Sequence, residues 1–284
     1  MVHKNLVSII VTCHGKSEFI EQAIKSVFAQ TYTNIEIILA NDGDTSKKLL
    51  IKLKLIKKKY CTIPIKIIFT RKNHGVSHCR NTCIRAANGI YIFPLDGDDL
   101  IHENYILGCV KILDTNPNAT IAYSLVLMFD TQKTWPKIRI LAKDNENLIA
   151  AAYIPSAHMF RKSDWSRVGG YNEKLLNGEE DWDFNIKRIL PNKKFVRINE
   201  YFMFYRQTNN SRQKEFDKSL CSKFTNDLII MQNNIDIFCD NIEQYYHHQK
   251  VKTKIIRKIF ALSYLYFKYA KNYFFIIKTL REYI

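Results

Sequence analysis

The chain has 284 residues, of which 46% are hydrophobic and 25% are charged, a composition that is ordinary for a globular protein with one large domain. Its net charge of +16 favours an anionic partner: a phosphorylated substrate, an acidic membrane surface or a nucleic acid. The seven cysteines lack paired spacing, which argues against a secreted disulfide scaffold. No signal peptide precedes the first strand-like run, so we expect a cytoplasmic protein.

The first hundred residues alternate between strand and helix patterns. We predict strands over 6–12, 35–40, 65–70 and 90–95, and helices over 18–30, 46–59 and 76–87. This rhythm predicts an α/β fold, in which a Rossmann-like, doubly wound and mostly parallel sheet is flanked by helices. The polar strand-to-helix junctions then meet at one edge of the sheet, where open α/β sheets bind ligands.

Three carboxylates follow the fourth predicted strand within four positions, in the run Asp96-Gly97-Asp98-Asp99. Such closely spaced negative charges repel one another unless a cation lies among them. Carboxylate oxygens suit Mg²⁺ or Mn²⁺, which proteins commonly hold with one or two carboxylates and the phosphates of a substrate. For an isolated Asp-x-Asp, a solvated acidic turn is the alternative interpretation.

The second half of the chain has a different pattern. We expect strands over 121–129 and 195–205, a short helix over 163–170, and a helix over 177–188 with acidic residues in its first turn. Residues 1–212 are predicted to form one domain. Within it, the change of pattern separates a first half, 1–118, from a second half, 119–212.

Residues 213–284 are predicted to form a basic, amphipathic helical extension. On a helical wheel of 250–280, lysine and arginine fall on one side and aliphatic and aromatic residues on the other. No stretch reaches the ~20 uninterrupted apolar residues that are needed to span a bilayer. Two interpretations stay open: the helix packs on the domain, or it rests on anionic lipid.

Several segments in this order and spacing resemble the family 2 glycosyltransferases of bacterial surface-glycan synthesis. The segments that carry the resemblance are 7–12, 23–27, 30–38, 41–43, 73–81, 95–99, 180–182 and 205–211. The resemblance implies a GT-A fold, a nucleotide-diphosphate sugar donor, a divalent metal (Mn²⁺ or Mg²⁺) and inversion at the anomeric carbon. It also implies that residues 1–118 are the nucleotide-sugar-binding half and residues 119–212 the acceptor half.

On the donor side, the resemblance implies that Thr12 and Asp42 contact the nucleotide base and that His14 stacks on it. Arg80 matches a position that would contact a phosphate or the base, and an internal salt bridge is its alternative role.

On the reaction side, the resemblance implies that Asp96 and Asp98 form a metal-binding DxD pair. Asp98 would be the direct ligand, Asp96 would lie nearer the ribose, and Asp99 would support both. Asp181 would be the general base, because an acceptor hydroxyl is too weak an acid to ionise at neutral pH.

The sequence departs from the family pattern at two positions. Asn41 stands where an aspartate is common, and Thr208 stands where a histidine is common. If that histidine normally contacts the metal or the diphosphate, His102 or His158 is the candidate to replace it.

The sequence thus predicts a metal-dependent, inverting hexosyl- or N-acetylhexosaminyltransferase. Its donor would be a nucleotide-diphosphate sugar, most simply a UDP-sugar. Its acceptor would be a hydroxyl of a lipopolysaccharide or lipooligosaccharide, capsule or lipid-linked glycan, reached at the inner face of the plasma membrane through the basic helices. One alternative is a catalytically inactive relative that binds nucleotide sugar. The other is a nucleic-acid-binding protein, but no recognised motif supports it and we expect no nucleic-acid partner.

Overall fold

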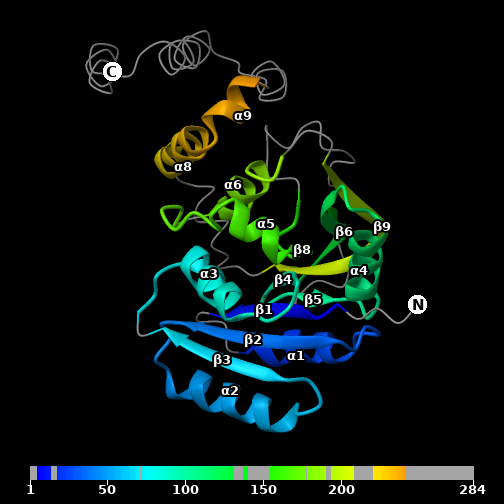
Figure 1. Ribbon diagram of the computed structural model, residues 1–284. Coiled ribbons are helices and arrows are strands. Elements are labelled where there is room, and N and C mark those ends of the chain that lie inside the picture. The colour runs from blue at the N-terminus through cyan, green and yellow to red at the C-terminus, as the bar shows by residue number, and fades with distance from the viewer. Residues whose placement is uncertain are drawn as a thin grey trace.

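The structure is a computed structural model that describes residues 5–13, 18–70, 72–130, 137–139, 154–176, 178–189, 193–207 and 220–240. Two β-sheets lie within these ranges, with helices packed around them (Figure 1). The mixed architecture, with a mostly parallel first sheet, confirms the predicted α/β fold.

The first sheet has the strand order β3-β2-β1-β4-β8. Its strands are β1 (Val7–Cys13), β2 (Ile35–Asp42), β3 (Ile65–Thr70), β4 (Tyr91–Asp96) and β8 (Phe160–Arg161). The first four are parallel, and β8 runs antiparallel to β4. Strand β3 is identical to the predicted range, and the other three parallel strands begin or end within two residues of their predictions.

Helices cover both faces of this sheet, which explains why its strands are apolar at nearly every position. On one face, Ile9 and Ile37 share a core cluster with α1 (Ile20–Phe28) and α2 (Lys47–Lys59). On the other face, Ile10 packs in a cluster with α3 (Val76–Ala86). Neighbouring residues of β1 therefore point to opposite helical layers.

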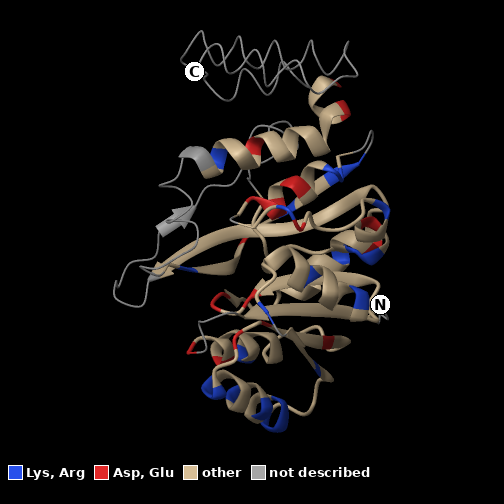
Figure 2. Ribbon diagram, turned by 90° about the vertical axis from the view of Figure 1, so that its left-hand side faces the viewer, with Lys and Arg blue, Asp and Glu red and all other residues tan. Residues whose placement is uncertain are grey.

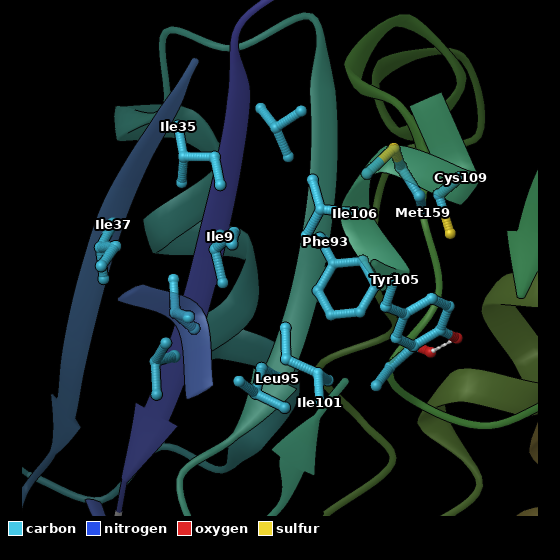
Figure 3. Packing of buried hydrophobic residues seen from close by; sticks show 14 of the residues in the cluster. Ile9, Ile35, Ile37, Phe93, Leu95, Ile101, Tyr105, Ile106, Cys109 and Met159 are labelled. Carbon is cyan, nitrogen blue, oxygen red and sulfur yellow. Dashed lines mark hydrogen bonds between the residues drawn. The ribbon is translucent and has the colours of Figure 1, made fainter. Parts of the chain in front are cut away.

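The second sheet has the strand order β5-β9-β6-β7. Its strands are β5 (Leu100–Ile101), β6 (Ala119–Asp130), β7 (Lys137–Arg139) and β9 (Lys194–Gln207). Helix α4 (Tyr105–Thr115), which the sequence analysis did not assign, joins the two sheets. Its Tyr105 meets Phe93 of β4 edge to face at 5.1 Å (Figure 3).

Two short helices carry the residues that follow β8: α5 (Lys162–Arg167) and α6 (Glu180–Ile186). Helices α8 (Leu220–Asn233) and α9 (Ile235–Asp240) pack on α6, where Ile230 and Phe238 share a cluster with Trp182. The first described helices of the predicted extension therefore pack on the domain.

The amphipathic stretch over 250–280 lies outside the described residues. The proposed division at residue 212 stays a prediction. Among the described residues, every helix is too short or too polar to cross a membrane.

Candidate functional site

The carboxyl ends of β1, β2 and β4 bring together Thr12, Asp42 and Asp96. Thr12 lies directly opposite Asp96 in the pairing of β1 with β4, and its hydroxyl donates to Asp96 Oδ1 at 3.2 Å. Asp42 is 5% exposed, and its Oδ1 accepts hydrogen bonds from the His74 backbone N–H at 3.1 Å and the Thr70 hydroxyl at 3.2 Å. The carboxylate of Asp42 therefore ties the end of β2 to the loop that opens α3.

Asn41 shapes the loop that follows β2. Its side-chain amide donates to the Asp44 carbonyl at 2.7 Å, and its Oδ1 accepts from the Asp44 backbone N–H at 2.9 Å. A carboxylate could accept the second bond but could not donate the first. Next to it, Gly43 has φ +74°, and a Cβ there would lie 2.2 Å from the Asn73 nitrogen. The loop after β2 and the loop that opens α3 are therefore in direct backbone contact at Gly43 and Asn73.

The acidic turn after β4 is held by backbone hydrogen bonds. Gly97 N–H donates to the Thr12 carbonyl at 2.9 Å, and Asp99 N–H donates to the Asp96 carbonyl at 3.0 Å. Asp96 and Asp98 are both partly exposed, whereas Asp99 is 1% exposed. The Oδ1 atom of Asp99 accepts from the Arg206 backbone N–H at 2.9 Å. Asp99 thus fastens the turn to β9, in agreement with a supporting role.

Arg80 of α3 joins this acidic turn to α6. Its side chain is 1% exposed, and it donates to Asp96 Oδ1 at 2.8 Å and to Glu180 Oε1 at 3.0 Å. Burial opposes the charged guanidinium, but the negative charges of Asp96 and Glu180, with a smaller effect of Asp181, raise the pKa of Arg80 above its ordinary value. The internal salt bridge, one of the two alternatives for Arg80, is therefore present.

Asp181 lies in the first turn of α6 and is partly exposed, while its neighbours Glu180 and Trp182 are buried. Its Oδ1 accepts from the Trp182 backbone N–H at 2.8 Å. The helix follows Glu179, whose φ of 63° is the one positive value of a non-glycine residue in the described part of the chain. Backbone of this kind is often found at functional sites, where the surrounding structure holds it.

The comparisons with known proteins agree with this arrangement. The family model described as "Glycosyl transferase family 2" matches residues 8–207. This chain belongs to glycosyltransferase family 2.

A chondroitin synthase of Escherichia coli is 25% identical over 189 residues, which cover 64% of this chain and 26% of that synthase. Residues of this glycosyltransferase thus match only about a quarter of that relative's length. Solved structures share the fold at low identity. TarS of S. aureus in complex with UDP-GlcNAc has a TM-score of 0.66 at 14% identity, covering 89% of this chain and 78% of that one.

A mannosyltransferase of Pyrobaculum calidifontis in complex with GDP-Man and Mn²⁺ has a TM-score of 0.63 at 12% identity, covering 98% of this chain and 79% of that one. These two structures confirm the predicted GT-A fold.

The carboxylates of the acidic turn, Asp96 and Asp98, are of the kind that binds a divalent metal. Asp96 Oδ1 accepts hydrogen bonds from Arg80 and Thr12, whereas Asp98 is partly exposed. No group of three or more His, Cys, Asp or Glu side chains with metal-binding geometry occurs within the described ranges. Two carboxylates that share a metal with substrate phosphates do not need a third protein ligand.

The two histidines considered as replacements are both engaged. His158 is fully buried, its Nδ1 donates to the Pro155 carbonyl at 2.7 Å, and its Nε2 accepts from Arg188 at 2.8 Å. Burial, and then the charge of Arg188, lower the pKa of His158 well below its ordinary value. His158 is therefore not available to bind metal, and that suggestion is wrong. The His102 ring stacks on Phe202 at 4.7 Å.

Arg206 is the site residue to which the sequence analysis gave no role, although it lies in the matching segment 205–211. Its Nε donates to the Asp98 carbonyl at 2.7 Å, and its Nη2 donates to Gln22 Oε1 at 2.6 Å. The guanidinium lies between the rings of Phe19 and Phe129, at 4.3 and 4.5 Å from their centroids. Arg206 therefore braces the backbone of the acidic turn. His14 and Thr208 lie outside the described residues.

Proposed function

We propose that this chain transfers a sugar from a nucleotide-diphosphate donor to an acceptor hydroxyl, with inversion at the anomeric carbon. The observation that carries the proposal is the bridge formed by Arg80, which joins the acidic turn of Asp96 and Asp98 to the start of the helix that bears Asp181. Donor-side and acceptor-side carboxylates are thereby connected through one buried side chain.

On the donor side, Thr12, His14 and Asp42 would bind the nucleotide base, with Asp42 accepting a hydrogen bond from a pyrimidine N3–H. This role favours a UDP-sugar. Asp98, with Asp96 beside it, would hold Mn²⁺ or Mg²⁺, which when bound neutralises negative charge on the diphosphate. The Mn²⁺ and nucleotide-sugar complexes of the structural relatives support this assignment.

On the acceptor side, Asp181 would accept the proton of the attacking hydroxyl. The acceptor oxygen forms a bond to the anomeric carbon as the bond from that carbon to the diphosphate breaks, and the nucleoside diphosphate leaves with the bonding electrons. Attack from the face opposite the diphosphate inverts the configuration. Asp181 is suited to this work because its carboxylate is partly exposed at the start of α6, close to the buried Arg80 that joins this helix to the acidic turn.

The transferred group would be a hexose or an N-acetylhexosamine, and the acceptor a surface glycan such as lipopolysaccharide, capsule or a lipid-linked precursor. The similarity to a chondroitin synthase supports a glycan acceptor. The enzyme would be cytoplasmic and would reach such acceptors at the inner face of the plasma membrane. Residues 213–284 would contribute to membrane contact.

A screen of nucleotide sugars with and without Mn²⁺, by thermal shift and by donor hydrolysis, tests the proposal. We expect one class of donor to stabilise the protein, more strongly with metal. Asp98→Asn should abolish the metal effect, whereas Asp181→Asn should keep donor binding and lose transfer. Asp236→Asn, an exposed position on α9, is the matched control. Near-normal transfer by Asp181→Asn would exclude its role as base, and binding without turnover by the unmodified chain would indicate an inactive relative.

A further inference from the structure

Helix α2 carries an unusual outer surface. Seven of its 13 residues are lysines, and none is acidic. A solvated surface helix normally mixes both signs of charge, because like charges one turn apart repel each other. Figure 2 shows these lysines gathered at the lower end of the molecule, where Figure 1 places α2.

Two large aliphatic side chains lie among these lysines and point away from the core. Ile51 is 58% exposed and Leu55 is 59% exposed, one turn apart. The core side of the helix is formed by Leu49, Leu53 and Ile56, which are buried. At 100° per residue, Ile51 lies roughly opposite that buried side, so the exposed pair is not an extension of the core stripe.

The lysines divide into two groups. Lys59 forms an ion pair with Glu21 of α1 at 2.7 Å, and Lys52 donates to the Glu18 carbonyl at 3.3 Å. Lys47, Lys54 and Lys58 are exposed and lie next to Ile51 on one side of the helical wheel, and the exposed Lys48 lies next to Leu55 on the other side. In the part of the chain that the structure describes, no ion pair involves Lys47, Lys54 or Lys58. Exposed lysines therefore border the aliphatic pair on both sides.

Single exposed apolar residues are ordinary on a protein surface. Ile51 and Leu55 differ because they lie one turn apart on a helix that carries seven lysines and no acidic residue.

We propose that the outer face of α2 is a docking surface for an anionic lipid bilayer. The aliphatic side chains would enter the boundary between headgroups and acyl chains, while the lysines extend their ammonium groups to lipid phosphates. A soluble polyanion would account for the lysines but not for Ile51 and Leu55. The surface is distinct from the C-terminal basic helices and does not depend on the proposed transferase activity.

The position of α2 relates this surface to the site. The helix begins after Ser46, which accepts a hydrogen bond from the Leu49 backbone N–H and closes the loop that follows Asp42. A bilayer along α2 would therefore border the edge of the sheet where the candidate site lies.

Cosedimentation of the full chain with vesicles tests the proposal. Neutral phosphatidylcholine vesicles are compared with vesicles that contain about one third phosphatidylglycerol. The aliphatic variant is Ile51→Gln with Leu55→Gln, and the basic variant replaces Lys47, Lys54 and Lys58 by Gln. The control for the aliphatic variant is Ile90→Gln with Leu176→Gln, two exposed aliphatic residues outside α2. The control for the basic variant replaces three exposed lysines outside α2, Lys111, Lys174 and Lys194, by Gln.

We expect the unmodified chain to bind the anionic vesicles only. Binding should weaken roughly tenfold or more in the basic variant, since each lysine near an anionic surface contributes about fivefold. It should weaken by a similar factor in the aliphatic variant, because two aliphatic side chains are lost from the bilayer boundary. The controls should bind within about twofold of the unmodified chain. Equal binding by the α2 variants, or no vesicle binding by the unmodified chain, would overturn the proposal. A loss in the lysine variant alone would overturn it as well, because the contact would then be purely electrostatic and would not involve Ile51 and Leu55.

A second measurement reports the depth of insertion directly. Ile51→Trp should gain fluorescence quenching by lipids brominated on their acyl chains, relative to the unmodified chain, when anionic vesicles are present. Unchanged quenching would contradict insertion of this face. Unchanged circular dichroism and thermal midpoints verify that the variants fold, as expected for exposed positions.

Discussion

Removal of the Arg80 side chain is the most direct test of how the site is held together. In Arg80→Met, two charge-assisted hydrogen bonds are lost: a partly buried one to Asp96 at 2.8 Å and a buried one to Glu180 at 3.0 Å. Glu180 is 3% exposed, so its carboxylate would lose its buried cationic partner. Breaking a buried ion pair from one side costs about 3–5 kcal/mol, because a charge is left in a region of low polarity.

Urea denaturation followed by circular dichroism measures this free energy of unfolding. We expect Arg80→Met to lose about 3–5 kcal/mol, with a thermal midpoint lower by roughly 10 °C. Adding Glu180→Gln should recover part of the loss, because the glutamine is neutral. Arg167→Met is the matched control: Arg167 is 40% exposed in its pair with Asp164, and such pairs contribute less than about 1 kcal/mol.

Two results would refute this reasoning. A loss below about 1 kcal/mol in Arg80→Met would mean that the buried pairs contribute no more than exposed ones. The absence of any recovery on adding Glu180→Gln would mean that the destabilisation does not arise from the remaining buried carboxylate.

Three further outcomes follow from the contacts of the site. Gly97→Ala should lower the free energy of unfolding by about 1–3 kcal/mol and weaken binding of the sugar donor, because the added Cβ would lie 2.9 Å from the Thr12 backbone oxygen. Unaltered donor affinity in calorimetry would contradict this. Asn234→Ala should lose about 2 kcal/mol in urea denaturation, because Asn234 donates to the buried Asp183 carboxylate at 2.8 Å, and an unchanged midpoint would be inconsistent with that bond. Burial, and then the charge of Asp227, raise the pKa of Glu179 from its ordinary value of 4.5 to about 7, so the folded state retains a proton that the unfolded state releases. The thermal midpoint should therefore fall as the pH rises from about 4.5 to 7, and Glu179→Gln should flatten this part of the profile; an identical slope in both proteins would argue against the assignment.

The sequence alone determined the four parallel strands of the first sheet and the helices between them. The strand predicted over 65–70 is β3, and the helix predicted over 46–59 is α2 with its Ser46 cap. These elements were predictable because apolar periodicity and capping residues act over a few neighbouring positions. Short strands such as β5 and β8, of two residues each, carry no such pattern and exist because a distant strand pairs with them.

The tertiary structure alone decided how the site residues are connected. The sequence left Arg80 between a phosphate contact and a salt bridge, and its partner Glu180 lies 100 positions away. Arg206 reaches the acidic turn from 107 positions away, where its backbone N–H meets Asp99. Such pairs depend on where the fold brings α6 and β9, which no local pattern records. The chemistry of the acidic turn could be read from the sequence, whereas the bracing of that turn by buried charges depends on the packing of the whole domain.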